Sequence, residues 1–350
     1  MILDDVAEMK RRDLHATGEV LAGFGDQCRA AAALTATPSG SARRPSVVVL
    51  AGMGGSAASG DLLAVLASDR LDIPVLVHRG YGLPAMANER ALVIASSYSG
   101  NTAETVSALE TAVVRGVPVV AITTGGRVGE LAAAHGLPRV TLPTGLQPRM
   151  AYGYLFFPAL RILRETGLPI VVDSEITETL ELLDEMAEEL APARPSPANE
   201  AKRLATAIAS RLPVIYGGPE TGAIAYRWKT DVEENAKMLA IAGAVPEMNH
   251  NEIEAWRAPN AAGLHLVLLR DRAETAEITR RFGVVQDLVG AAAGGISESW
   301  TRGASRLARL LSLLYVGQWT SYYLALLRGV DPWSVPLLDE LKRRMAPGSS

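Results

Sequence analysis

Short apolar runs recur through the first half of the chain, and stretches with helical spacing lie between them. The first run, SVVVL at Ser46–Leu50, ends directly before a group of glycines. Runs that are apolar at every position are typical of central strands in a parallel sheet, because such strands are buried on both faces. The other predicted strands are Ile73–Val77, Ala91–Ala95, Val117–Thr123 and Arg139–Leu142, and the helical patterns between them include Ala57–Ala67, Thr102–Arg115 and Arg127–His135. This alternation predicts a doubly wound parallel sheet with right-handed crossovers.

The second half repeats this order with more helix. A long helix over Met150–Thr166 and a charged amphipathic helix over Ile176–Leu190 lead to Ala191–Asn199, whose three prolines indicate a linker. The predicted strands after it are Pro213–Tyr216, followed by a Gly-Gly turn and a helical pattern to Met238, and His265–Leu269; the later helices are Glu274–Ala293, Ser305–Arg328 and Ser334–Arg344. The expected fold is α/β, with two doubly wound subdomains and extra C-terminal helices. The expected division is into residues 1–170, 171–198 and 199–350.

Composition supports two cores and excludes some partners. The 350 residues are 48% hydrophobic, which suits more than one domain. The net charge is −4, with 34 Lys and Arg against 38 Asp and Glu, so we expect neither a nucleic-acid nor an anionic membrane partner. The one cysteine, Cys28, excludes an internal disulfide and fits a reducing cytoplasm. Four histidines are scattered along the chain and offer no metal-binding pattern: His15, His78, His135 and His265.

One apolar stretch approaches the length of a membrane span. It runs for 18 residues from Leu310 to Leu327, and it contains serine, threonine and glutamine. This length is at the short limit for a bilayer, so we expect a buried core helix. The N-terminus, MILDDVAEMKRRD, is charged within its first four residues and does not have the apolar region of a signal peptide. We therefore expect a cytoplasmic protein.

Glycines open the helix after the first predicted strand, in the sequence AGMGGS at 51–56. Glycine lets the backbone turn sharply, and a helix N-terminus offers free N–H groups to an anion. The dinucleotide pattern GxGxxG fails because Ala57 stands where its last glycine is needed, and no P-loop lysine follows. A tight turn with glycines for steric reasons alone is the alternative. Gly54, Gly55 and Ser56 are candidate phosphate ligands.

Hydroxyl groups are concentrated after the third predicted strand, in SSYSGNT at 96–102. Neutral donors and a helix dipole can together hold a phosphate dianion at such a place. The alternative is an ordinary helix start, in which the hydroxyl of Thr102 caps the backbone. Ser97, Ser99 and Thr102 are the candidate phosphate ligands of this loop.

Together, GMGGS and SYSGNT at this separation resemble the sugar isomerase (SIS) domain. Four further motifs make the whole chain similar to the bifunctional phosphoglucose/phosphomannose isomerase family: AYRWK at 225–229, ENAK at 234–237, NHNE at 249–252 and RGVDP at 328–332. The resemblance implies two flavodoxin-like SIS subdomains without a cofactor. It implies that glucose 6-phosphate and mannose 6-phosphate are interconverted with fructose 6-phosphate through an enediol or enediolate. It also implies a homodimer.

The same resemblance assigns roles to four charged or titratable residues. Glu234 would be the general base, and Arg149 would stabilise the enediolate with a guanidinium that stays protonated. His250 would act in ring opening at the neighbouring subunit's site, and Lys342 is the candidate for the ring-opening lysine of the C-terminal helix. The alternative for Glu234 is a solvated side chain paired with Lys237 three residues later. Arg149 could instead be a helix-start arginine in a surface pair. His250 could be a loop histidine that satisfies local hydrogen bonds, and Lys342 a cation that complements the helix dipole.

Two features of the sequence limit these roles. Glu233 is adjacent to Glu234, but about 100° separates them around a helix, so one of the two faces a site. Val335 stands where the family leads us to expect threonine, which puts tolerance of both sugar epimers in doubt. A silent sugar-phosphate sensor is the alternative function, although no DNA-binding pattern accompanies the motifs. An amidotransferase-type synthase would need an additional N-terminal nucleophile domain.

Overall fold

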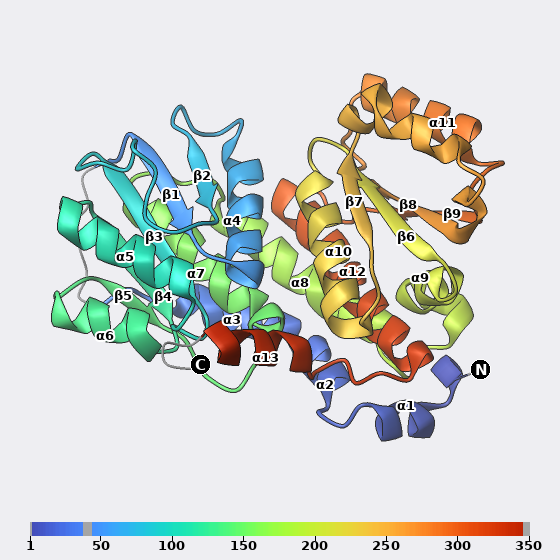
Figure 1. Ribbon diagram of the computed structural model, residues 1–350, viewed down its shortest axis with the longest axis horizontal. Helices are drawn as coiled ribbons and strands as arrows, with labels where there is room; N and C mark the ends of the chain where they lie inside the picture. Colours follow the sequence, from blue (N-terminus) through green and yellow to red (C-terminus); the bar gives the residue numbers. More distant parts are fainter. Residues whose placement is uncertain (1, 38–43, 346–350) are drawn as a thin grey trace. The chain divides into compact units, whose positions relative to one another are not determined.

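A computed structural model of the chain describes residues 2–37 and 44–345, which form two compact units (Figure 1). The first-sheet unit comprises residues 23–187 and 301–312. The second-sheet unit comprises residues 2–22, 188–300 and 313–345. Each unit contains one parallel β-sheet with helices on its faces.

The first sheet has the predicted doubly wound topology. Its strands are β1 (Val47–Ala51), β2 (Val75–His78), β3 (Ala91–Ser97), β4 (Val119–Thr123) and β5 (Arg139–Thr141). They are parallel and lie in the order β2-β1-β3-β4-β5, which is the flavodoxin-like order. In this order the chain changes direction across the sheet between β1 and β3, and ligands of such folds bind at this switch point.

Helices cover both faces of the first sheet. One face carries α3 (Phe24–Ala33), α4 (Gly54–Ala67) and α7 (Tyr152–Glu165), and the other carries α5 (Ala103–Arg115) and α6 (Gly126–Ala134). On β3, Ala91, Val93 and Ala95 pack in the core below α5 and α6. Because side chains alternate along a strand, Ser97 continues this row to the carboxyl edge of the sheet, on the α5 side.

The second sheet has four parallel strands in the order β7-β6-β8-β9. They are β6 (Leu212–Gly217), β7 (Ile241–Ala244), β8 (Leu264–Arg270) and β9 (Gly295–Trp300). The edge strands β7 and β9 were not predicted. Both contain glycine, and most of their residues are only partly buried, so neither shows the continuous apolar run of a central strand. The central strands β6 and β8 coincide with the two predicted runs.

The helices around the second sheet are α9 (Glu200–Ile208), α10 (Gly222–Ala236) and α11 (Ala276–Val289), with short 3-10 turns η3 (Ser196–Ala198), η4 (Glu247–His250), η5 (Glu252–Arg257) and η6 (Ala261–Gly263). Aromatic and aliphatic side chains of α11 and η5 pack on one face of β6 and β8. On α10, the indole of Trp228 donates to the Leu313 carbonyl at 2.9 Å. The close fit of this indole against Gly317 leaves no room there for a Cβ atom.

The N-terminal segment belongs to the second-sheet unit, whereas the expected division placed it with the first sheet. It contains η1 (Ile2–Asp4), α1 (Val6–Arg12) and α2 (Thr17–Ala22). The ammonium of Lys202 explains the arrangement: it is fully buried and donates to the Leu3 carbonyl and, at 2.7 Å, to the carbonyls of Pro192 and Arg194. The Tyr315 hydroxyl donates to the Leu21 carbonyl at 2.7 Å. A buried ammonium needs several acceptors, and this segment supplies one of them.

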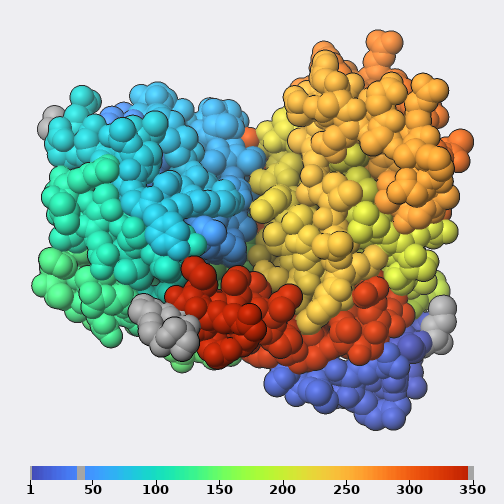
Figure 2. Space-filling view, viewed as in Figure 1, coloured from blue at the N-terminus to red at the C-terminus, as the bar shows by residue number. Residues whose placement is uncertain are grey.

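Three further elements complete the chain. Helix α8 (Asp173–Leu190) follows α7, α12 (Arg306–Arg328) runs through the predicted apolar stretch, and α13 (Pro336–Met345) comes last. Among the described residues, α12 is the one helix long and apolar enough to cross a membrane, but 94% of its most apolar window is buried inside the protein. This burial confirms the predicted core helix. In contrast, α13 has no buried residue, and Figure 2 shows it in red on the surface.

Candidate active site

The glycine loop after β1 brings the start of α4 against the turn that carries Arg149. No side chain caps α4, whose first residue, Gly54, has a positive φ of 51°. A Cβ atom on Gly55 would lie 2.9 Å from the carbonyl oxygen of Pro148, in the 3-10 turn η2 (Pro148–Met150). Gly55 therefore has a steric reason to be glycine. That close approach also places the buried Arg149 beside the loop.

In the loop after β3, hydroxyl groups bond to one another rather than cap a helix. The Ser97 and Thr102 hydroxyls are 2.9 Å apart, and the Gly100 N–H donates to the Ser97 hydroxyl at 3.1 Å. Thr102 occupies the N-cap position of α5, yet its side chain makes no capping hydrogen bond. The simple capping alternative therefore fails. The first N–H groups of a helix have no partner within the helix, so the start of α5 can receive an anion.

The two loops adjoin at the switch point of the sheet. Ala51 at the end of β1 pairs with Ala95 on β3. A Cβ atom on Gly52 would lie 2.9 Å from the Ser96 carbonyl oxygen. Along these loops Ser56 and Ser97 are buried, Thr102 is half-buried, and Ser99 is exposed. All predicted phosphate ligands therefore lie at one edge of the first sheet.

Two residues that sequence reasoning missed fix this edge. The Asn101 side chain accepts the Arg127 N–H at 3.0 Å and so holds the start of α6 against the loop. The Tyr98 hydroxyl donates to the Pro143 carbonyl at 2.8 Å and accepts the Leu146 N–H at 3.1 Å. Burial raises the pKa of Tyr98 above its ordinary value, so the phenol stays protonated for both bonds. In the sequence, the position of Tyr98 between two serines could have marked it as part of this site.

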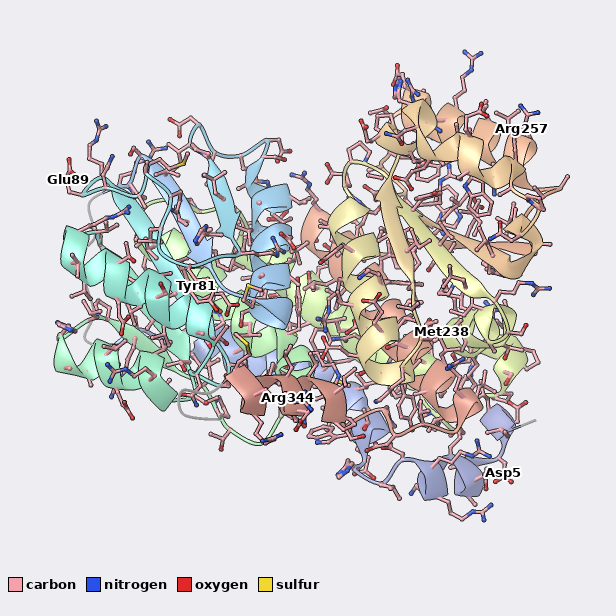
Figure 3. All side chains as sticks on the ribbon, in the orientation of Figure 1. Asp5, Tyr81, Glu89, Met238, Arg257 and Arg344 are labelled. Atoms are coloured by element: carbon pink, nitrogen blue, oxygen red, sulfur yellow. The ribbon has the colours of Figure 1, made fainter. Side chains whose placement is uncertain are left out.

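Glu234 lies near the C-terminal end of α10 in the second-sheet unit and is half-buried. Its neighbour Glu233 pairs with Lys229 at 2.7 Å, one turn back along the helix. This ion pair engages the Glu233 carboxylate along the helix. Met238, labelled in Figure 3, directly follows Lys237, the C-cap residue of α10.

The loop of His250 follows β7. His250 ends η4 and is exposed, while its two asparagine neighbours bond locally. The Asn251 side chain donates to the Glu247 carboxylate at 2.9 Å, and that of Asn249 contacts the Met248 sulfur at 3.1 Å. The Asn groups therefore shape the loop, and His250 projects from a structured turn.

Lys342 lies on α13 and is exposed. Its neighbours Arg343 and Arg344 both pair with Glu340 at 2.7 Å, so these two cations are engaged along the helix. Val335 directly precedes the helix and is half-buried. Glu234, His250 and Lys342 are thus on three separate elements of the second-sheet unit, whereas Arg149 and the phosphate-loop residues are in the first-sheet unit.

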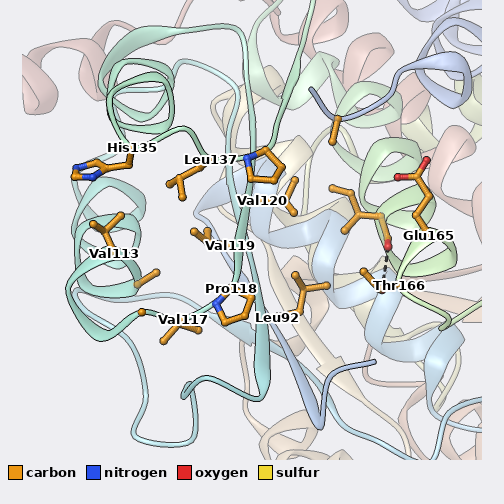
Figure 4. A pocket seen from close by; sticks show the side chains of 15 residues that line it. Leu92, Val113, Val117, Pro118, Val119, Val120, His135, Leu137, Glu165 and Thr166 are labelled. Carbon is orange, nitrogen blue, oxygen red and sulfur yellow. Dashed lines mark hydrogen bonds between the residues drawn. The ribbon is translucent and has the colours of Figure 1, made fainter. Parts of the chain in front are cut away.

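A cavity of about 520 Å³ in the first-sheet unit lies away from these residues (Figure 4). Leu92, Val119 and Leu137 line it at the amino-terminal ends of the strands, the edge opposite the phosphate loops. Its lining is mainly apolar, so it does not suit a phosphate. In the described ranges 2–37 and 44–345, no three His, Cys, Asp or Glu side chains form a group that could hold a metal ion.

Two segments match known domain families. Residues 197–345 match the bacterial phospho-glucose isomerase C-terminal SIS domain, and residues 43–129 match the SIS domain. The bifunctional phosphoglucose/phosphomannose isomerase of Caldicellulosiruptor bescii is 43% identical over 302 residues, which cover 85% of this chain and 89% of the relative. The protein of the same name from Thermoplasma volcanium is 34% identical over 85% of this chain and 91% of its own.

A solved structure described as a glucose-6-phosphate isomerase like protein from Thermus thermophilus has a similar fold. It aligns with a TM-score of 0.58 at 24% identity, over 93% of this chain and 99% of that chain. This likeness supports the two-subdomain SIS architecture.

Proposed function

Because the chain belongs to the bifunctional phosphoglucose/phosphomannose isomerase family, we propose that it is an aldose–ketose isomerase. It interconverts glucose 6-phosphate, and mannose 6-phosphate, with fructose 6-phosphate through an enediol or enediolate. The observation that carries this proposal is the Ser97–Thr102 hydroxyl pair at the uncapped start of α5, in a chain 43% identical to a bifunctional isomerase.

The substrate phosphate binds at the edge of the first sheet. Ser97, Ser99 and Thr102 supply hydroxyl or backbone donors, and the start of α4 at Gly54–Ser56 supplies N–H groups. The net charge of −4 gives no broad attraction for a dianion, so local donors must hold it. The helix dipoles of α4 and α5 add partial positive charge at the same place.

The proton transfer is assigned to Glu234. Its carboxylate takes the proton from C2 of the open-chain aldose, and the electrons of that C–H bond form the C1–C2 double bond of the enediolate. Negative charge develops on the C1 oxygen, and the Arg149 guanidinium stabilises it. The carboxyl group then returns the proton to C1 while the proton of the C2 hydroxyl passes to the C1 oxygen, which gives the C2 carbonyl and C1 hydroxyl of the ketose.

Ring opening precedes this transfer and needs a proton on the ring oxygen and the loss of one from the anomeric hydroxyl. Lys342 and His250 are the proposed groups for these two movements. Val335 lacks the hydroxyl of the threonine expected there, and valine for threonine changes hydrogen bonding at nearly constant volume. We therefore expect the two aldose epimers to differ in rate.

We also propose a homodimer in the cytoplasm, with His250 acting in the partner's site. The exposure of His250 in the single chain supports this arrangement. In a two-fold dimer, mixing a His250→Ala homodimer with a Glu234→Gln homodimer should give mixed dimers with one intact site. Random exchange should then restore activity to about a quarter of wild type. Full subunit exchange without recovered activity would place His250 in its own chain's site.

The experiment that tests the function is a coupled assay with each aldose phosphate. We expect fructose 6-phosphate to form from both, because one enediolate connects the two epimers at C2. Binding of both substrates without turnover of either would support the sugar-phosphate sensor instead.

A further inference from the structure

Lys237, the C-cap residue of α10, has a backbone conformation that is usually found for glycine at this position. Its φ is 51° and its ψ is 43°, in the left-handed region. Ala16 is the other non-glycine residue with a positive φ in the part of the chain that the structure describes. The residues that directly follow α5 and α12 are instead Gly116 and Gly329, both at a φ of 66°. A side chain in this conformation costs free energy, so its presence calls for a reason beyond ending a helix.

The Lys237 side chain supplies that reason through its contacts. Its ammonium donates to the backbone carbonyl of Asp331 and, at 3.2 Å, to that of Asn235. One residue before it, the Ala236 carbonyl accepts the Arg328 guanidinium at 3.0 Å. Cations at the carboxyl end of a helix also interact favourably with its dipole. Two side chains thus tie the end of α10 to the last residue of α12 and to the segment that follows it.

That segment is an ordered turn that leads directly into α13. The Asp331 carboxylate accepts the N–H groups of Trp333 at 3.0 Å and Ser334 at 3.2 Å. His15 lies 3.5 Å from the same carboxylate, and its ring stacks on Trp333 with the centroids 5.8 Å apart. Because no residue of α13 is buried, the placement of this helix depends on the turn at 331–334. In Figure 3, Met238 labels the chain just after α10, and Arg344 labels α13.

We propose that Lys237 is a positioning residue that holds the turn before α13, and with it Lys342, at the end of the helix that carries Glu234. This inference rests on the proposed function, because Lys237 would act by positioning Lys342, to which that function assigns a role in ring opening. Lys237 itself carries out no chemistry. Glycine at this position would relieve the backbone and remove the tie at the same time. Lys237→Gly should therefore stabilise the end of α10 and at the same time loosen the position of Lys342.

The test compares Lys237→Gly and Lys237→Arg with wild type by thermal unfolding, steady-state kinetics and amide hydrogen exchange. Lys237→Gly should keep or raise the Tm, speed exchange in peptides covering 329–341, and lower kcat about threefold to tenfold with little change in KM. Lys237→Arg should restore most of the protection and the rate. Lys229→Ala removes another α10 lysine that does not contact the turn, and should leave exchange at 329–341 unchanged.

A double variant identifies the element through which Lys237 acts. If it acts through α13, Lys237→Gly should cost little further activity in a Lys342→Ala background. If Lys237→Gly lowers activity in that background as much as it does in wild type, Lys237 does not act through α13. If Lys237→Gly alone keeps wild-type hydrogen exchange and wild-type kcat, the proposal is wrong. A lower Tm with faster exchange throughout the chain would also overturn it, as a merely structural role. If the wild type shows no isomerase activity, the proposed function fails, while the exchange measurement still decides whether Lys237 holds the turn.

Discussion

The centres of the two sheets share one topology, β2-β1-β3 and β7-β6-β8, but the loops at their carboxyl edges differ in chemistry. In the first-sheet unit, the loop after β3 is rich in hydroxyls, and the helix after it begins without a side-chain cap. In the second-sheet unit, Thr221 lies in the loop after β6, the counterpart of β1. It is buried, and its hydroxyl accepts the Gly218 N–H and donates to the Leu269 carbonyl. Its hydrogen-bonding capacity is used within the protein.

The end of β8 shows the same contrast. Arg270 pairs with the carboxylates of Glu274 and Glu298, and its guanidinium lies 4.5 Å from the centroid of the Phe282 ring and 4.4 Å from that of Trp300. Carboxylates at this place would repel a phosphate dianion. Two copies of one topology can therefore have different roles, because function depends on the loops rather than the sheet. The first edge suits a phosphate, and the second-sheet unit carries the proposed acid–base residues.

Replacing the proposed base should have the largest effect. Glu234→Gln keeps the shape of the side chain but cannot accept the C2 proton, so kcat should fall about 10²-fold to 10⁴-fold. Steady-state kinetics measures the loss. Glu233→Gln is the matched control and should stay near wild type, because a partly exposed ion pair contributes little. A large loss in the control with none in Glu234→Gln would move the base to Glu233.

Removing the hydroxyl pair of the first sheet should affect binding. In the double variant Ser97→Ala/Thr102→Ala, KM should rise about tenfold to a hundredfold, because two hydrogen bonds to a charged group are lost. Inhibition by inorganic phosphate should weaken in parallel, which a competition assay measures. Unchanged phosphate inhibition would place the phosphate at another loop.

The buried threonine in the β6 loop of the second sheet should affect stability alone. Thr221→Val should lower the free energy of unfolding by about 1–3 kcal/mol, because the Leu269 carbonyl and the Gly218 N–H lose a buried partner. Chemical denaturation measures this change. The KM for the sugar phosphate should not move. A raised KM with wild-type stability would mean that the second edge also binds substrate.

The smallest expected effect concerns acid sensitivity of the second-sheet unit. Burial, and then the charge of Arg211, lowers the pKa of His265 on β8, so the unfolded chain binds a proton more readily than the fold does. The free energy of unfolding is therefore highest above about pH 6.5, the pKa of histidine in an unfolded chain, and it decreases as the pH falls below that value. Between about pH 7 and about pH 5, the Tm should therefore decrease less for His265→Gln than for wild type. An equal decrease in Tm for the two proteins would assign the acid sensitivity to other groups.

Much of the fold could be predicted because its central strands are continuous apolar runs. Val47–Ala51 and Leu264–Arg270 are buried along almost their whole length, and that burial is what the sequence pattern records. The edge strand Ile241–Ala244 is partly exposed and short, so its pattern resembles a loop. The N-terminal segment is held to the second-sheet unit by polar contacts such as those of Lys202 and Tyr315, which no periodicity marks.

The candidate site shows a similar limit. The serines and glycines of both loops stood out in the sequence, but the reason for Gly55 is the Pro148 carbonyl, distant in sequence. Whether Thr102 caps its helix was undecidable from sequence, since Ser97 competes for its hydroxyl. Tyr98 and Lys237 act through backbone carbonyls, and a carbonyl leaves no mark in the sequence.

The central claim is that the first-sheet unit binds the phosphate while Glu234 of the second-sheet unit supplies the base. Calorimetric titration with glucose 6-phosphate tests it most directly when Glu234→Gln and Ser97→Ala/Thr102→Ala are compared with wild type. The account predicts that Glu234→Gln binds nearly as tightly as wild type and that the double variant loses about tenfold or more in affinity. Wild-type affinity in the double variant, or loss of binding in Glu234→Gln, would contradict this division of roles.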